Sequence, residues 1–373
     1  MNRYIVGEKE IPFNKIFLLS DLHFGIRSNS TEWLDNFKDF FQRFYIPWVK
    51  ENVENGDILF VLGDWFDNRQ LLDILVMNIS IDIVGELSKI LPVYFITGNH
   101  DIYKKKDTDV HSLRAFKFIN NVEIFEKPII IKNNNASILL LPWIGDRKEE
   151  EEYAKKNVNR ADYIFAHTNL SGFKYDNGKE IFKGSDLVSF NYKRVISGHI
   201  HKRQLDNNKG IYIGSPYHTK RSDIGNQKGV YIFYPKDNKL KFKENNYSPI
   251  YQKIPLTTIL DKTLKECYDI FSNNYSDIII PDEFIHLFSL PKFIDLLKDC
   301  PYKKIEAVGE RQKIDDDESI IINGESTKDI LTLIEETIDE VDQTKYNLDY
   351  RNCKSKLKKL NKEYYKKVQE ENN

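Results

Sequence analysis

Residues 16–23 have the sequence IFLLSDLH, a short apolar run that ends directly in a polar Asp-Leu-His segment. Four consecutive apolar residues with polar neighbours are typical of a strand buried on both faces, as in a parallel sheet. The polar segment would then lie at the carboxyl end of that strand, where open α/β sheets bind their ligands. The same arrangement recurs along the chain, and it decides both the predicted fold and the predicted site.

Further buried strands are predicted over residues 58–62, 93–97, 163–166 and 194–197, each rich in Ile, Val, Phe or Leu. Between the first two strands, aromatic residues from Trp33 to Trp48 recur at helical spacing and predict a helix that packs on the sheet. Residues 127–131 and 137–141 flank three asparagines and predict a hairpin, and 211–213 and 230–234 predict two more strands. This alternation of strands and amphipathic stretches is typical of a layered α/β domain.

Polar residues follow each of the five buried strands, and they include five of the eight histidines. Such strand ends open onto one crevice and would bring these side chains together. The mixture of carboxylate, amide and imidazole groups without cysteine suits manganese, zinc or iron. Seven ligands exceed the need of one tetrahedral ion and match two ions about 3.5 to 4 Å apart with one carboxylate shared. The predicted metal ligands are Asp21, His23, Asp64, Asn99, His167, His199 and His201.

His100 lies between Asn99 and Asp101 and is left over as a proton carrier. A single short motif of this kind is more often structural than functional, but five in order, each after a predicted strand, favour a site. The histidines outside this set are His111, His218 and His286, and the last is predicted to be a packing residue.

The composition limits the functional classes. Hydrophobic residues make up 40% of the chain, which excludes a disordered protein, and the net charge of −2 excludes a global positive field that would hold a polyanion. No apolar run has the length of a bilayer span or signal peptide, so we expect neither a membrane span nor secretion. Three cysteines without metal-ligand spacing fit a reducing, cytoplasmic compartment.

Three segments are predicted: a catalytic domain over 1–250, a small α+β capping domain over 251–325, and a helical tail over 326–373. Prolines punctuate the chain after residue 250. In the tail, Tyr346, Tyr350, Leu357, Leu360 and Tyr364 belong to an apolar seam of heptad-like spacing, with lysines on the other face. A helix packed on its own protein and a helix that docks on a partner are both compatible with this seam.

Taken together, the motifs D-x-H, G-D-x-x-D, G-N-H-D, H and G-H-x-H resemble those of the calcineurin-like metallophosphoesterase superfamily. The resemblance implies an α/β fold, a two-sheet sandwich flanked by helices. It implies one metal at Asp21, His23 and His201 and another at Asn99, His167 and His199, with Asp64 bridging them. It further implies that His100 protonates the leaving oxygen or steadies the transition state, that Asp101 orients His100, and that Asp67 supports the ligands.

Within this superfamily, residues 166–172 and the Gly-Ser-Pro-Tyr block in 213–218 are similar to the SbcD nucleases, especially phage recombination endonuclease subunits. The similarity is strong over about residues 15–250 and weak beyond. It implies two divalent metal ions, most favourably Mn²⁺, DNA as substrate, and an SbcC-type coiled-coil ATPase as partner through the tail. A homodimer and a cytoplasmic location in a bacterial or phage-infected cell are further expectations.

Three groups of basic residues follow the ligand motifs or the Gly-Ser-Pro-Tyr block and are predicted to contact DNA phosphates without reading the base sequence. They are Lys104, Lys105, Lys106, Lys202, Arg203, Lys220 and Arg221.

Three functions are compatible with these observations. The first is a manganese-dependent DNA exonuclease and endonuclease in which a metal-bound hydroxide attacks the phosphodiester. The second keeps the metals but acts on nucleotides or other small phosphoesters, because the fold alone does not select the substrate. The third is a binding scaffold that no longer catalyses, although such a scaffold would be expected to lose ligands, and none is missing.

Overall fold

A computed structural model describes residues 3–104, 107–206, 209–260, 262–280 and 304–309. Its main part contains a seven-stranded and a six-stranded sheet. In spatial order the first consists of β1 (Glu8–Glu10), β8 (Ile129–Lys132), β9 (Ser137–Leu141), β10 (Tyr163–His167), β11 (Arg194–Gly198), β13 (Gly210–Tyr212) and β12 (Gln204–Asp206). The second consists of β15 (Lys239–Glu244), β14 (Gly229–Tyr234), β2 (Ile16–Leu19), β3 (Ile58–Val61), β4 (Val93–Ile96) and β7 (Val122–Phe125).

The two sheets share one core. Alternate residues of each strand point to opposite faces, so Ile16 and Leu18 of β2 face the inter-sheet core while Phe17 and Leu19 face the helices. The same alternation places Phe60 and Phe165 between the sheets, where their rings meet edge to face at 5.7 Å. The predicted two-sheet α/β sandwich is therefore confirmed.

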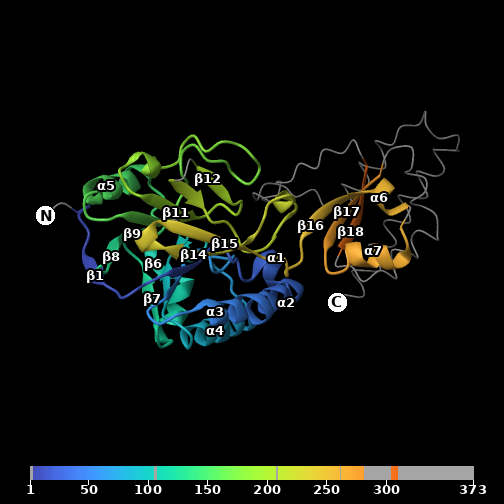
Figure 1. Cartoon of the computed structure of the whole chain (residues 1–373), viewed down its shortest axis with the longest axis horizontal. Coiled ribbons are helices and arrows are strands. Elements are labelled where there is room, and N and C mark those ends of the chain that lie inside the picture. Colours follow the sequence, from blue (N-terminus) through green and yellow to red (C-terminus); the bar gives the residue numbers. More distant parts are fainter. Residues whose placement is uncertain (1–2, 105–106, 207–208, 261, 281–303, 310–373) are drawn as a thin grey trace, which may run out of the picture. The chain divides into compact units, whose positions relative to one another are not determined.

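Helices cover the six-stranded sheet on its outer side, where α2 (Thr31–Asp39), α3 (Ile46–Asn52) and α4 (Ile74–Ser88) lie together (Figure 1). The predicted aromatic helix is interrupted by one π-helical segment, Phe40–Tyr45, in which the Ile46 amide donates to the Phe41 carbonyl five residues back. The next residue is Pro47, which has no amide hydrogen to donate. The aromatic stripe is buried in the predicted core.

On the other outer side, α5 (Arg147–Asn157) packs on the seven-stranded sheet (Figure 1). The hairpin predicted around the asparagines is present as the antiparallel pair of β8 and β9. The remaining short elements are α1 (Ile26–Asn29), the hairpin strands β5 (Ile102–Lys104) and β6 (Asp107–His111), and 3-10 helices Ser112–Phe118, Leu187–Ser189, Arg221–Asp223 and Pro235–Asp237. None of the helices that the structure describes is long and apolar enough to cross a membrane.

A separate parallel sheet follows residue 250 and consists of β16 (Tyr251–Pro255), β17 (Tyr275–Ile280) and β18 (Lys304–Gly309), with α6 (Leu256–Leu260) and α7 (Leu264–Phe271). Trp33 of α2 stacks on Tyr275 at 5.4 Å, and Tyr275 donates a 2.6 Å hydrogen bond to Glu32. The predicted tail over 326–373 and His286 lie outside the described residues. The division into three segments stays a prediction.

Candidate metal centre

The five predicted site segments all follow strand ends on one edge of the sandwich. Asp21 and His23 follow β2, Asp64 follows β3, and His199 follows β11. These four residues have positive φ angles of 55°, 52°, 53° and 92°, an uncommon backbone region for residues other than glycine. The loops after β2 and β3 hold each other in this conformation, because the Leu22 and His23 amides both donate to the Asp64 carbonyl. Backbone strain of this kind concentrates at functional sites.

Glycines allow these loops to approach one another. A Cβ atom on Gly98 would lie 2.2 Å from Asp64 Oδ1 and 2.4 Å from the Asp64 amide nitrogen. A Cβ on Gly198 would lie 2.5 Å from the Leu62 carbonyl oxygen. Gly98 therefore permits close contact between two loops of the six-stranded sheet, and Gly198 permits close contact between strand ends of the two different sheets.

Three clusters of candidate ligands result, in each of which the ligand atoms lie within 4.8 Å of one another: Asp21 with His23 and His201, His23 with Asp67 and His100, and Asp64 with His167 and His199. We call Asp21, His23 and His201 the first half-site, and Asn99, His167 and His199 the second half-site. Asp64 joins the two, because its Oδ2 lies 3.8 Å from His23 Nε2 and 3.2 Å from His167 Nε2. All seven predicted ligands are thus brought together.

The first half-site leaves nitrogen atoms without partners. His23 Nδ1 donates to Asp67 Oδ1 at 3.1 Å, while its Nε2 is buried and has no hydrogen-bond partner among the described residues. His201 Nδ1 is likewise buried and has no hydrogen-bond partner among the residues that the structure describes. The nearest oxygen of Asp176 is 3.9 Å away. Asp21 uses both oxygens to accept the His199 amide, at 2.9 and 3.1 Å.

The second half-site is linked internally. Asn99 Oδ1 lies 2.7 Å from His199 Nδ1 and 3.1 Å from His167 Nε2. The other nitrogen of His167, Nδ1, lies 2.7 Å from the Leu62 carbonyl and must donate to it. This bond fixes the ring and directs Nε2 toward Asp64.

The carboxylates and histidines shift one another's proton affinity. Burial alone would lower the pKa of His167, but the charge of Asp64 and a hydrogen bond to it outweigh burial and raise this pKa to about 9. Burial raises the pKa of Asp21 to about 6, against the opposing charge of His167. Burial, and then the charge of His167, lower the pKa of His199 to about 3. Without a cation, protonation is therefore favoured at His167 beside Asp64. Burial would lower the pKa of His23 as well, but the neighbouring carboxylates, Asp67 foremost, raise it.

His100 is oriented differently from the prediction. Its Nδ1 lies 2.6 Å from the Asp67 carbonyl oxygen and donates to it, which leaves Nε2 as the nitrogen that can exchange a proton. Asp101, expected to orient this ring, instead accepts backbone amides of Asp64, Gly98, Trp65 and Phe66 at 2.8 to 3.3 Å. Asp101 therefore fastens the loops after β3 and β4 to each other. Asp67 contacts both histidines, His23 with its side chain and His100 with its carbonyl.

Several supporting residues were not singled out in the sequence. Lys228 is buried, donates to the His201 carbonyl at 2.7 Å, and pairs with buried Asp223 at 2.6 Å. Asp176 accepts the Lys202 amide at 2.9 Å next to His201. The Trp143 indole packs on the His199 ring with centroids 5.0 Å apart. Nothing in the local sequence marks these residues, because their partners lie on distant segments.

Several of the basic residues predicted to contact DNA phosphates have side chains that are already paired with another group. Lys220 pairs with Asp176 at 3.0 Å, Arg221 pairs with Asp277 at 3.0 Å, and Arg203 donates to the Tyr231 hydroxyl at 2.6 Å. Lys104 is exposed and Lys202 is half-buried, whereas Lys105 and Lys106 lie outside the described residues. A continuous basic track is therefore not formed by the predicted residues that the structure describes.

The donor set fits divalent metal ions. Burying His23 Nε2 without a hydrogen-bond partner costs folding free energy. A bound cation would accept the lone pair of this nitrogen, which no described protein group uses. Carboxylate, amide and imidazole donors without thiolate suit manganese, zinc or iron. The first half-site, the second half-site and Asp64 between them provide donors for two such ions.

Comparisons with known proteins identify the family. The sequence profile of calcineurin-like phosphoesterases matches residues 14–203, about half of the chain, so the chain belongs to this family of metallophosphoesterases, which use divalent metals. It is 29% identical over 166 residues to the candidate phosphoesterase 078R of Invertebrate iridescent virus 3, covering 43% of this chain and 47% of the viral protein. It is 28% identical over 209 residues to the candidate phosphoesterase 244L of Invertebrate iridescent virus 6, covering 54% and 69%.

The chain thus spans about half the length of the first of these relatives. The crystal structure of a protein of unknown function from Aquifex aeolicus matches at 17% identity, covering 48% of this chain and 86% of that one, with a TM-score of 0.24.

Proposed function

We propose that this chain is a DNA nuclease that hydrolyses phosphodiester bonds with two divalent cations, Mn²⁺ being the expected ion. The observation that carries the proposal is the position of Asp64, whose Oδ2 faces His23 of the first half-site and His167 of the second. A shared carboxylate between two imidazole-bearing half-sites is the arrangement that clamps an in-line displacement at phosphorus. The half-sites would hold one ion each.

Cations in such sites offset charge on phosphoryl oxygens and lower the pKa of bound water. The residues of the chain provide proton transfer and hold the ligands in position. His100, fixed through its Nδ1, is placed to hold or release a proton at Nε2. Asp67 keeps His23 and His100 in position, and Asp101 keeps the two ligand loops together.

DNA is favoured as substrate by the resemblance of residues 166–172 and 213–218 to SbcD nucleases. The second block contacts the site, because the Ser215 amide donates to the His201 carbonyl at 3.1 Å and the Tyr217 hydroxyl donates to the Leu22 carbonyl at 2.7 Å. The block therefore has a structural role beside the candidate ligands.

The test is hydrolysis of linear double-stranded and single-stranded DNA by purified protein with Mn²⁺, and with Mg²⁺ and Zn²⁺ for comparison. We expect Asp64→Asn to abolish cleavage and to reduce the bound metal measured by elemental analysis. Asp82→Asn is the matched control, since Asp82 is exposed on α4, outside the ligand loops. If the wild-type protein cleaves small phosphodiesters but no DNA with any of these metals, the alternative function on nucleotides or other small phosphoesters replaces this proposal.

We further propose that the tail, residues 326–373, docks on an SbcC-type ATPase through the seam that contains Tyr346, Tyr350, Leu357, Leu360 and Tyr364. An amphipathic helix commonly binds a partner by laying its apolar face in a groove. A chain that ends at residue 325 should keep Mn²⁺-dependent cleavage but lose co-purification with the ATPase. Co-purification that survives this deletion would contradict the docking role.

A further inference from the structure

A pocket of about 560 Å³ lies beside the candidate metal centre and takes no part in the chemistry described above. Its walls come from the segment after β7 and the segment after β9. β7 is the parallel neighbour of β4, whose following loop carries Asn99 and His100, and β9 is the parallel neighbour of β10, which ends at His167. The pocket therefore lies one strand further along the same carboxyl edge in both sheets, where α/β folds bind ligands.

Trp143 connects the pocket to the metal centre. This residue lines the pocket, and its ring packs against His199 of the second half-site with centroids 5.0 Å apart at an angle of 39°. Gly145 lies against the indole edge, since a Cβ on Gly145 would be 3.0 Å from Trp143 Nε1. The indole is thus held between a candidate ligand and the pocket.

The lining suits a flat, uncharged group. Apolar and aromatic surfaces come from Pro128, Pro142, Trp143, Ile144 and Tyr153. The charged lining residues are Lys127 and three acids, Glu126, Asp146 and Glu149. These acids are partly engaged, since Lys117 pairs with Glu126, Arg3 lies 3.6 Å from Glu149, and Asp146 Oδ1 accepts the amides that begin α5. Their remaining carboxylate oxygens are suited to accept hydrogen bonds from the amino groups of bases.

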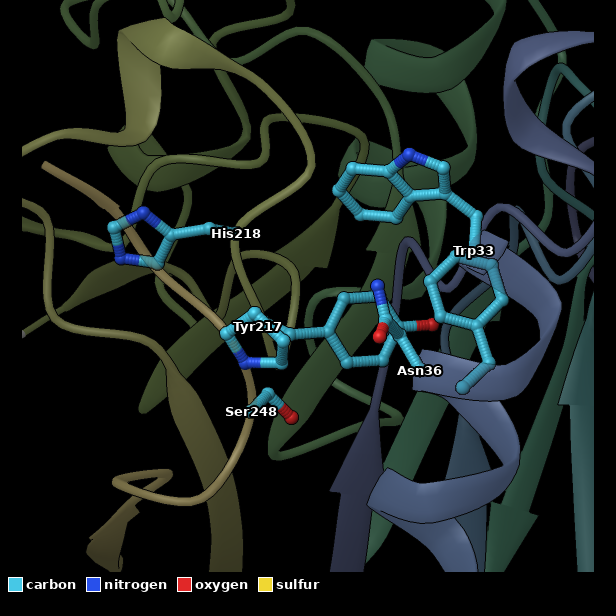
Figure 2. A pocket seen from close by; sticks show the side chains of 7 residues that line it. Trp33, Asn36, Tyr217, His218 and Ser248 are labelled. Carbon is cyan, nitrogen blue, oxygen red and sulfur yellow. The ribbon is translucent and has the colours of Figure 1, made fainter. Parts of the chain in front are cut away.

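The volume also suits such a group, since pockets for small molecules commonly measure roughly 300 to 1,000 Å³. By contrast, the cavity in Figure 2, bounded by Trp33, Asn36, Tyr217, His218 and Ser248, has only about 10 Å³, which is the space of a single water. That cavity is a packing defect between α2 and neighbouring loops and has no room for a substrate.

We propose that the Trp143 pocket binds the base of the nucleotide next to the scissile phosphate. This inference rests on the proposed phosphodiesterase function and adds a determinant of specificity to it. A base that enters the pocket leaves its stack, so the enzyme should prefer single-stranded DNA or frayed ends to internal duplex. Stacking of a base on an aromatic side chain tolerates any base sequence.

The experiment compares two substrates with Mn²⁺: the 4-nitrophenyl ester of 2′-deoxyadenosine 5′-phosphate, which carries a base, and methyl 4-nitrophenyl phosphate, which does not. We expect Trp143→Ala to raise KM for the nucleoside ester by about tenfold or more. Trp143→Phe should keep KM close to that of the wild type, because it preserves an aromatic face. Because Trp143 packs on His199, its loss should also slow the methyl ester, but by less. Tyr153→Ala, whose side chain is not among the candidate ligands or their contacts, should raise KM for the nucleoside ester alone. Phe118→Ala changes a ring that is 93% exposed and serves as the control.

The two esters separate the pocket from the metal centre. If Trp143→Ala impairs both esters equally, Trp143 acts only by supporting His199 and the inference is overturned. If it impairs neither, the pocket binds no base.

If the wild type hydrolyses neither ester with any divalent metal, the inference is decided by binding, and the proposed function is decided separately by the cleavage of DNA. Saturation-transfer NMR with 2′-deoxyadenosine 5′-monophosphate in EDTA should show contacts to the adenine protons in the wild type but not in Trp143→Ala. Their absence in the wild type would overturn the inference.

Discussion

The two half-sites differ in how far the protein completes them without a cation. In the second half-site, Asn99 Oδ1 already lies within hydrogen-bond distance of both His167 and His199. In the first half-site, the buried Nε2 of His23 and Nδ1 of His201 have no hydrogen-bond partners among the described residues. The second half-site is therefore preorganised by its own hydrogen bonds, whereas the first depends on a cation to satisfy its nitrogens.

We expect the largest loss of activity from a substitution that disrupts both half-sites at once. In Gly98→Ala the new Cβ would overlap Asp64 Oδ1, so the carboxylate that joins the half-sites must move. We expect phosphodiester hydrolysis to fall by more than about 100-fold, since even an outer partner of a ligand can cost that much. Gly85→Ala is the matched control, because no atom lies within 4 Å of its added Cβ. Two tightly bound ions and near-normal activity in Gly98→Ala would show that Asp64 does not join the half-sites.

A smaller change sharpens the comparison by weakening the first half-site alone. Asp67→Ala removes the carboxylate 3.1 Å from His23 Nδ1, and we expect Mn²⁺ affinity at one site to fall by about 10- to 100-fold. Asp67→Asn keeps an oxygen that can accept the His23 hydrogen and should lose less. Isothermal titration calorimetry would resolve the two binding steps. Equal weakening of both steps would contradict the separation into half-sites.

The pH dependence of metal binding tests the second half-site. Because the pKa of His167 in the metal-free protein is raised to about 9, the ring is protonated below that pH and must release its proton to bind a cation. Affinity should therefore decrease by up to about tenfold for each pH unit below 9, and protons should be released on binding. Below pH 6, protonation of Asp21, whose pKa is raised to about 6, should add to this loss. Calorimetry in buffers of different ionisation enthalpy measures the released protons, and no release at pH 7 would rule out this assignment.

The smallest expected effect concerns stability without metal. Asn99→Ala leaves buried His167 and half-buried His199 without their shared acceptor, so the free energy of unfolding in EDTA should fall by about 1 to 3 kcal/mol. Asn78→Ala, on an exposed position of α4, should change it by less than about 0.5 kcal/mol. Urea denaturation followed by circular dichroism makes the comparison. An unchanged midpoint for Asn99→Ala would show that the second half-site is not preorganised.

The sequence predicted the strands of the sandwich and the convergence of its strand ends well. Period and composition determine where a buried strand such as Ile58–Val61 lies, and the polar residue after it is visible in the same short window. Parallel pairing then places these residues at one edge regardless of the intervening loops. This is why the seven predicted ligands, which are far apart in the chain, lie close together in the structure.

The partners of the supporting residues could not be predicted in the same way. Lys228 and Asp223 form a buried pair beneath His201, yet in the sequence they read as ordinary charged residues near a strand. Likewise, Lys220 and Arg221 read as a basic pair, but Asp176 and Asp277, from loops and strands elsewhere, neutralise them. Charge in a sequence does not show which opposite charge folds against it.

The aromatic stack of Trp33, Tyr251 and Tyr275 has a practical consequence for dissecting this protein. The rings of Tyr251 and Tyr275 lie 4.8 Å apart and cover the exposed side of Trp33, so the sheet after residue 250 shields part of α2. A polypeptide that ends at residue 250 would expose the Trp33 indole to solvent, and exposed apolar surface of this kind promotes aggregation. Excision of the sandwich for crystallisation should therefore retain β16 to β18 rather than stop where the composition changes.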